Sequence, residues 1–231
     1  MIEITTELPT INLPIKKVLA QLFQAYIYTA LDDIEHEGYR HPNGKRFKSM
    51  NFKISYRGNR IEAKFVALDP KNEEKLAQHA LYNFKLGDLK LNRTSISIKN
   101  RNYNISSYIK VGGFISINTK DKTSKNGKRY LEPKDSEFIE KLQINTIQKY
   151  ETLFKKPYMG ELKIELLDQK PKPIFSYYKK GAIKVWYGVY RIKGEKEILE
   201  MILNTGMGAN CMKGVGFVEL FESGGAKTPT Y

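Results

Sequence analysis

The first hundred residues show the hydrophobic periods of strands and helices in turn. Residues 2–8 read as a strand, and the apolar positions from Ile15 to Ile34 recur three and four residues apart, which predicts one long amphipathic helix. The later elements are alternating runs at 49–56 and 61–68 joined by a glycine-containing turn, a helix over 70–84 and a strand over 88–98. This order, β-α-β-β-α-β, is that of a ferredoxin-like unit.

The second half of the chain repeats the order. Its predicted elements are a strand over 107–118, a loop or hairpin tip over 119–129, a helix beginning near Asp135, strands over 161–168 and about 182–192 separated by the Lys/Pro-rich segment 169–173, a short helix over 195–204 and a strand over 215–221. We therefore expect an α+β protein of two tandem ferredoxin-like domains with antiparallel sheets. The N-terminal domain is predicted to span residues 1–100 and the C-terminal domain residues 101–231, with a loose tail over 224–231.

Composition narrows the class of protein. The 231 residues carry 39 lysines and arginines against 25 aspartates and glutamates, a net charge of +14. No apolar run approaches the roughly 20 residues of a membrane-spanning helix. The single cysteine, Cys211, excludes an internal disulfide framework and a cysteine-built zinc site. We expect a cytoplasmic protein without a membrane partner.

The positive charge is clustered, which favours a polyanionic partner. Residues 38–64 hold eight basic residues against one acidic residue, residues 84–130 hold eleven against two, and residues 170–193 hold seven against none. Aromatic side chains stand among these charges: Tyr39, Phe47, Phe52, Tyr103, Tyr108, Tyr177 and Tyr178. Rings beside cations suit stacking on unpaired bases, so nucleic acid is favoured over a basic face that only keeps the protein in solution.

A glycine-rich segment over residues 206–217 is the most specific motif. Its glycines follow a predicted helix and lead into a strand, whereas a dinucleotide-binding fingerprint follows a strand and opens a helix. Paired glycines let a backbone approach a bulky ligand and offer N–H groups to phosphate, although a simple turn before the last strand would use glycines too. The glycines are Gly206, Gly208, Gly214 and Gly216, with Lys213 between them.

In this segment the sequence resembles the repeat-associated mysterious protein (RAMP) superfamily, and within it the CRISPR repeat-processing endoribonucleases. The resemblance covers about residues 2–221 of the chain. Outside the glycine-rich segment it rests on Tyr28, on Glu35-His36-Glu37-Gly38-Tyr39, on Arg46-Phe47-Lys48-Ser49-Met50-Asn51-Phe52, and on Tyr130-Leu131, Phe138, Asn145 and Lys149-Tyr150.

The resemblance implies cleavage of CRISPR repeat RNA, the precursor of guide RNAs, without a metal or any other cofactor. A general base takes the proton of the ribose 2′-OH, the oxygen attacks the adjacent phosphorus, and an acid or a cation assists the departing 5′-oxygen. The products are a 2′,3′-cyclic phosphate and a 5′-OH. The implied partners are the repeat RNA and other subunits of a CRISPR effector complex, with the protein itself a monomer or a homodimer.

Three histidines can titrate near neutral pH and are therefore candidate acids or bases. His36 follows the predicted first helix, in a loop position that can display a catalytic group, although capping of that helix is the alternative. His41, in the next loop, is the rival catalyst. His79 lies within the second predicted helix beside its packing face.

Tyr28 and Lys48 complete the predicted catalytic set. Tyr28 falls about 150° from the centre of the apolar stripe of the first helix, so its hydroxyl can face a ligand. Lys48 can stabilise charge on the phosphate, or only contact the RNA backbone. The predicted RNA-binding residues are Arg40, Lys45, Arg46, Lys53, Lys213 and the four glycines, and no metal site is predicted. The alternative for the whole protein is a non-catalytic RNA-binding RAMP subunit of an effector complex.

Overall fold

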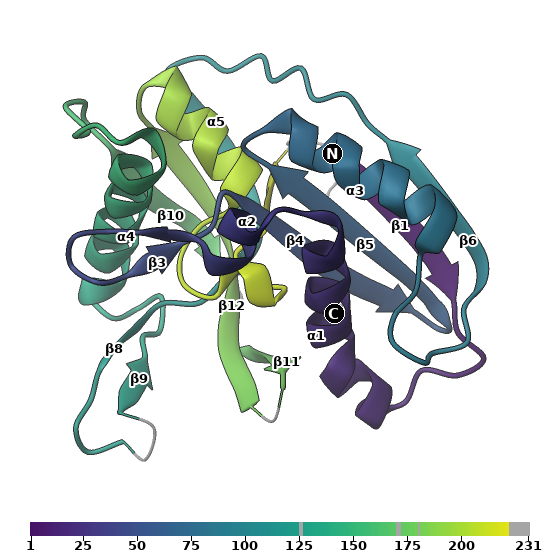
Figure 1. The fold of residues 1–231 in the computed structure, drawn as a ribbon. Helices are drawn as coiled ribbons and strands as arrows, with labels where there is room; N and C mark the ends of the chain where they lie inside the picture. The colour runs from purple at the N-terminus through teal and green to yellow at the C-terminus, as the bar shows by residue number, and fades with distance from the viewer. Residues whose placement is uncertain (125–126, 170–171, 180, 222–231) are drawn as a thin grey trace.

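The structure, a computed structural model, describes residues 1–124, 127–169, 172–179 and 181–221. Within these residues each half of the sequence forms an antiparallel sheet with its own helices (Figure 1). The tail predicted over 224–231 lies outside the described residues. No described helix is long and apolar enough to cross a membrane.

The first sheet has the strand order β4-β5-β1-β6, and neighbouring strands are antiparallel. Its elements are β1 (Ile2–Glu7), α1 (Leu13–Ala30), β4 (Met50–Arg57), β5 (Arg60–Ala67), α3 (Pro70–Asn83) and β6 (Asn92–Ile98). Phe23 of α1 meets Phe52 of β4 edge to face, with ring centroids 5.2 Å apart, and Leu76 of α3 is buried in the same core. The order of elements is the one that the hydrophobic periods predict.

The second half repeats the arrangement, with the strand order β10-β12-β7-β13 and a further strand, β11, paired to β12. Its elements are β7 (Tyr108–Ile115), α4 (Glu137–Phe154), β10 (Lys163–Gln169), β11 (Ile174–Tyr178), β12 (Gly181–Lys193), α5 (Lys196–Thr205), the 3-10 turn η1 (Cys211–Lys213) and β13 (Val218–Leu220). Phe138 of α4 and Ile198 of α5 are buried against this sheet. The protein is therefore an α+β protein of two tandem ferredoxin-like units, as predicted.

The predicted first helix is too long. It ends at Ala30 because Leu31 and Asp32 have extended backbones, and Ile34 is 52% exposed instead of belonging to the apolar face. Asp32 takes the N-cap position of a separate short helix, α2 (Asp33–Glu37), a position that aspartate favours.

Some small strands are also outside the predicted set. They are β2 (Tyr39–Arg40), paired with β3 (Arg46–Phe47), and β11, which pairs with the first residues of β12. The segment predicted as a loop or hairpin tip forms a hairpin of β8 (Asn118–Lys120) and β9 (Lys128–Tyr130). Each of these strands is short and is stabilised by pairing with another strand. The residues of the short strand alone do not predict that pairing.

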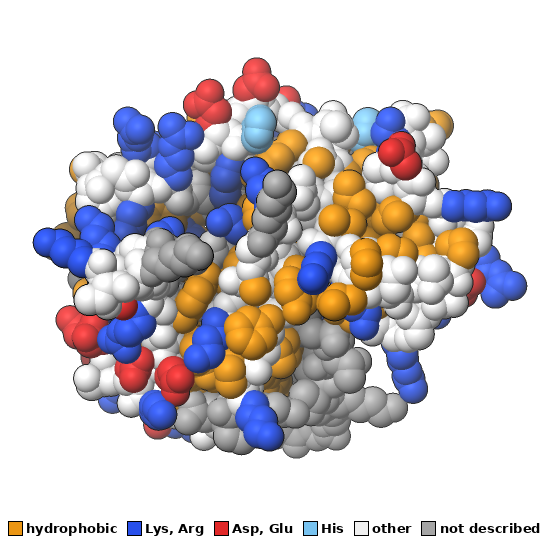
Figure 2. Space-filling model, turned by 90° about the horizontal axis from the view of Figure 1, so that it is seen from below, with side chains coloured by type: hydrophobic (Ala, Val, Ile, Leu, Met, Phe, Trp, Pro, Cys, Tyr) orange, Lys and Arg blue, Asp and Glu red, His pale blue; other side chains and the backbone are white. Residues whose placement is uncertain are grey.

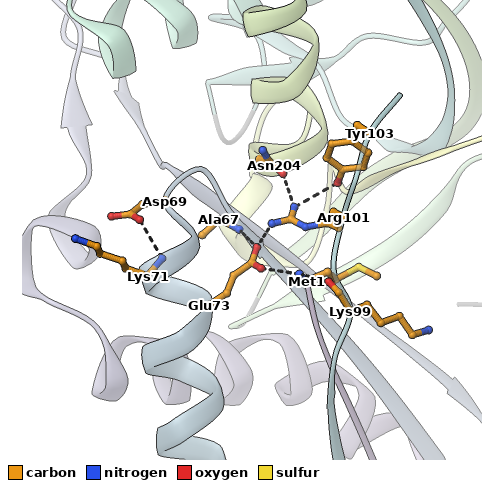
Figure 3. Close-up of polar contacts among 9 residues, drawn as sticks. All are labelled: Met1, Ala67, Asp69, Lys71, Glu73, Lys99, Arg101, Tyr103 and Asn204. Atoms are coloured by element: carbon orange, nitrogen blue, oxygen red, sulfur yellow. Dashed lines mark hydrogen bonds and ion pairs between the residues drawn. The ribbon is translucent and has the colours of Figure 1, made fainter. Parts of the chain in front are cut away.

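A buried carboxylate joins the two halves near the connecting segment (Figure 3). Glu73 of α3 is 7% exposed and accepts hydrogen bonds from Arg101 and from the Ala67 N–H at 2.9 Å. It also pairs with the amino group of Met1 at 2.6 Å. Arg101, which follows the last strand of the first sheet, donates in addition to Asn204 of α5. These contacts tie α3 to α5 through the connecting segment.

A second cluster of charges joins the sheets themselves. Glu219 of β13 forms ion pairs with Lys53 of β4 and Lys64 of β5. Burial by itself raises the pKa of Glu219, but the two ammonium groups outweigh it, so that the pKa of this carboxyl is lowered. The division of the chain at residue 100 stays a prediction; it falls between β6 and β7.

Candidate functional site

Three side chains that the sequence predicts separately as candidate catalytic residues lie together where α1, α2 and β3 meet. The rings of Tyr28 and His36 are in contact, with centroids 4.6 Å apart, and Lys48 Nζ lies 5.1 Å from the centre of the Tyr28 ring. Tyr28 belongs to α1, His36 to α2, and Lys48 directly follows β3. His36 is exposed, while Tyr28 and Lys48 are half-buried. This corner, named the His36 corner below, presents an imidazole, a phenol and an ammonium group within one small area.

The short helix α2 is held in place by a buried carboxylate. Glu35 is 6% exposed and accepts hydrogen bonds from three side chains outside the helix, those of Tyr39, Ser49 and Asn72. The helix ends at Gly38, whose φ is +81° and where a Cβ would stand 2.7 Å from the carbonyl oxygen of Phe47. Because only glycine fits there without strain, α2 can lie close to the strand that precedes Lys48.

Burial makes the ammonium group of Lys48 easier to deprotonate. Its Nζ donates to the backbone carbonyl oxygens of Glu35, at 3.0 Å, and His36. Burial lowers the pKa of Lys48 to about 8, against an opposite effect of the nearby Glu35 carboxylate. At neutral pH the Lys48 side chain is therefore still charged in most molecules, and half of the molecules have lost this proton at about pH 8.

Burial makes the phenol of Tyr28 harder to deprotonate. It raises the pKa of Tyr28 to about 12, so the hydroxyl keeps its proton at neutral pH. Tyr28 can thus donate a hydrogen bond but is a poor general base. Its position away from the centre of the apolar stripe does not keep Tyr28 out of the packing, because its ring also lies against the first hydrophobic core.

The other histidines lie apart from this corner. His41 Nδ1 accepts a hydrogen bond from the Asn43 N–H at 3.2 Å, and Nε2 lies 3.5 Å from the carboxylate of Glu151 on α4. His79 contacts the ring of Tyr26 and the hydroxyl of Thr29. The structure therefore brings His36, and not His41, to Tyr28 and Lys48.

A groove of about 680 Å³ lies beside the His36 corner, between the two halves of the chain. Among the described residues that line it none is acidic and eight are basic, namely Lys45, Arg46, Lys48, Lys120, Lys128, Lys141, Lys149 and Lys213. Figure 2 shows lysine and arginine side chains gathered on the side of this face where β8 and β9 lie. Lys48 belongs both to this basic groove and to the His36 corner.

The predicted RNA-binding cations divide into two groups. Lys45, Arg46 and Lys213 line the basic groove together, and their contact with RNA stays a prediction. Arg40 is exposed on β2, opposite Arg46 in register, but does not line the groove. Lys53 is engaged in the ion pair with Glu219, so the structure gives this lysine a role between the sheets.

The second half supplies groove lysines that the sequence reasoning missed. Lys141 and Lys149 stand eight residues apart on α4, with Asn145 midway, and this spacing places all three on one side of the helix. Lys149 is 3% exposed, and its Nζ donates to the carbonyl oxygen of Gly206 at 2.8 Å. The four-residue spacing was a usable signal for Lys141, whereas Lys120 and Lys128 reach the groove only because β8 and β9 form a hairpin.

The glycine-rich segment is largely buried, and Gly206 and Gly216 in it serve the protein's own packing. The segment has φ values of +74° at Gly206 and Gly216, where a Cβ would stand 2.3 Å from a backbone carbonyl oxygen. Their N–H groups donate to the carbonyl oxygens of Ile202, at 2.8 Å, and Phe114, at 2.9 Å. The expectation that these N–H groups face a phosphate does not hold for these two glycines. Gly208 lines the basic groove, so a ligand contact there stays a prediction.

The described residues contain no group of three or more His, Cys, Asp or Glu side chains placed to hold a metal ion.

Comparison with known proteins decides the family. Residues 98–220, just over half of the chain, match the family described as CRISPR associated protein Cas6, C-terminal. The chain belongs to the Cas6 family. The match covers the second ferredoxin-like unit together with the glycine-rich segment, and it confirms the resemblance drawn from the sequence. The Cas6 family acts in the processing of CRISPR repeat RNA.

Solved Cas6 structures share the whole architecture. A structure described as CRISPR associated protein Cas6 has a TM-score of 0.70 and 18% identity over 96% of this chain and 98% of its own. An RAMP protein binding different RNA substrates has a TM-score of 0.71 and 18% identity over 96% of this chain and 100% of its own. A Cas6-related protein from Pyrococcus furiosus has a TM-score of 0.72 and 17% identity over 96% of this chain and 99% of its own. At these identities the likeness is one of fold. No curated protein gives a significant match to the chain.

Proposed function

We propose that this member of the Cas6 family is an endoribonuclease that cuts CRISPR repeat RNA into guide units without using a metal ion. The observation that carries the proposal is the place of Lys48, which lines the basic groove and also lies beside Tyr28 and His36. An RNA strand held along the groove would bring its riboses and phosphates to an exposed imidazole.

The charge of the groove supports RNA as its ligand. Lysine and arginine side chains that neutralise phosphates release counter-ions, which gives affinity for a nucleic acid backbone of any sequence. The eight basic residues of the groove come from both halves of the chain, so a bound strand would contact the two ferredoxin-like units together. The fold is one that the RNA-binding RAMP protein named above also has.

The geometry supports the following division of roles. The His36 imidazole takes the proton of the 2′-OH, and the freed oxygen attacks the adjacent phosphorus. The bond from phosphorus to the 5′-oxygen breaks, the Lys48 ammonium stabilises the negative charge of the phosphate, and the departing oxygen takes a proton from water. The protonated hydroxyl of Tyr28 positions the reacting group by a hydrogen bond. These steps leave a 2′,3′-cyclic phosphate on one fragment and a 5′-OH on the other.

Incubation with the cognate repeat RNA in excess EDTA, followed by a denaturing gel and analysis of the fragment ends, tests the proposal. We expect cleavage at one position with a 2′,3′-cyclic phosphate end. Cleavage that appears only after Mg²⁺ is restored would contradict the mechanism. Binding without cleavage under both conditions would instead favour the non-catalytic RAMP subunit.

Lys48 predicts how cleavage depends on pH. With a pKa of about 8, its charged fraction falls from about nine-tenths at pH 7 to about one-tenth at pH 9. We therefore expect the single-turnover rate to fall about tenfold over this range, if the ammonium is required. Lys48→Arg should cut more slowly but without this decline, because a guanidinium stays charged throughout. An equal decline in both proteins would rule Lys48 out as its source.

A further inference from the structure

Next to the basic groove lies a smaller hollow that the proposed cleavage chemistry does not use. It is formed between α1, β4 and β11, and its lining includes Lys16, Tyr56, Phe175 and Tyr177. Its volume is about 30 Å³, room for one or two water molecules, so it cannot enclose an organic ligand. A flat ring can only lie across it.

The hollow is surrounded by aromatic rings with cations beside them. Lys16 Nζ lies 4.5 Å from the centre of the Tyr56 ring, and Lys17 Nζ lies 5.6 Å from that of Tyr177. Phe175 is 55% exposed and stands two residues before Tyr177, so both rings leave β11 on the same side. Figure 2 shows hydrophobic side chains across the middle and right of this face, over β11 and α1, with lysine and arginine side chains among them.

Residues that line the hollow directly adjoin residues that line the groove. Lys213 lines the groove, and the next residue, Gly214, lines the hollow. On α1, Gln24 lines the groove and Ala20, one helical turn earlier, lines the hollow. Tyr178, the chain neighbour of Tyr177 in the hollow, contacts two groove residues: its hydroxyl donates to Gln24, and its ring lies 5.4 Å from Lys213 Nζ. A strand that leaves the groove at Lys213 therefore meets the aromatic rings next.

We infer that the hollow is a second RNA subsite, at which an unpaired base of the strand leaving the groove stacks on Phe175 and Tyr177. Lys16 and Lys17 would contact the flanking phosphates. The inference rests on the proposed function, because it takes RNA to be the ligand of the groove. Stacking uses the face that every base has, so the subsite accepts single-stranded RNA of any sequence. In a duplex the bases are already stacked on one another, so no base face is free to stack on Phe175 and Tyr177.

The test is affinity for a fluorescently labelled oligouridylate of about 16 nucleotides, the upper end of the usual site size for such surfaces. Phe175→Ala and Tyr177→Ala should each weaken binding about 5- to 150-fold, since stacking contributes about 1–3 kcal/mol per base. Phe175→Trp should retain affinity, whereas Phe175→Leu, which keeps apolar area but has no ring, should lose it. Lys16→Ala should lower the slope of log affinity against log salt by about 0.7.

Tyr82→Ala is the matched control, because this tyrosine is 85% exposed on α3 and lines neither the groove nor the hollow. Affinities of the Phe175 and Tyr177 variants equal to that of Tyr82→Ala would overturn the subsite. So would a change of oligomeric state on Phe175→Ala with RNA affinity intact, which would make the face a contact between copies. If Lys128→Ala, in the groove, weakens binding and Phe175→Ala does not, the groove stands and only the subsite fails. If neither does, the proposed function fails as well.

Discussion

Replacement of His36 with alanine is expected to lower the single-turnover rate of cleavage by about 10²–10⁴, the usual contribution of a general acid or base. Its imidazole is exposed and contacts Tyr28, and the buried Glu35 next to it, not His36 itself, holds α2 in place. RNA affinity and the unfolding midpoint should therefore stay close to those of the unaltered protein. The measurement is a single-turnover time course at saturating protein, with affinity measured separately.

His41→Ala is the matched control for this experiment. His41 lies against Glu151 of α4, away from Tyr28 and Lys48, so its loss should leave the rate nearly unchanged. Tyr28→Phe and Lys48→Ala should each cost less than His36→Ala, because their proposed roles are positioning and charge stabilisation. A large loss on His41→Ala with none on His36→Ala would make the assignment of the base wrong.

Gly216→Ala is expected to destabilise the protein by about 3 kcal/mol or more, because strain and overlap add at this position. The residue has a φ of +74°, and a Cβ would stand 2.3 Å from the carbonyl oxygen of Met207. Either the glycine-rich segment or β13, which follows it, must move to make room. The midpoint of urea unfolding measures the effect.

Gly58→Ala separates strain from overlap. Gly58 also has a positive φ, +59°, but a Cβ there would meet nothing within 4 Å. Its replacement should cost only the backbone strain, about 1–2 kcal/mol. If Gly58→Ala and Gly216→Ala destabilised the protein equally, the close approach of the backbone at Gly216 would not be a reason for glycine at that position.

Much of the fold was open to prediction because periodicity carries it. Alternating runs such as β4 and β5, and helices with one apolar side such as α3, identify themselves locally, and their order then specifies the ferredoxin-like unit. The break between α1 and α2 was missed because Ile34 continues the helical spacing. Only the extended backbones of Leu31 and Asp32 show that the apolar stripe has ended.

The candidate site was predictable residue by residue but not as an arrangement. His36, Tyr28 and Lys48 were each named from the sequence, yet their proximity depends on the approach of α2 to the strand before Lys48 at Gly38. The groove depends still more on tertiary structure, because it combines lysines that lie more than a hundred residues apart in the chain. Lys53 illustrates the converse: it lies in the most basic stretch of the first half, and its partner is Glu219 of the second.

Cleavage of a repeat RNA with a single 2′-deoxy nucleotide immediately before the mapped cut site is the most direct test of the central claim. The substitution removes only the hydroxyl that is proposed to attack the phosphorus, and leaves the phosphates that the basic groove would bind. We predict that this RNA is bound with nearly unchanged affinity and is not cut, with EDTA present or absent. Cutting at the same position at a rate comparable to that of the unmodified RNA would contradict the account, because the nucleophile would then be something other than the ribose.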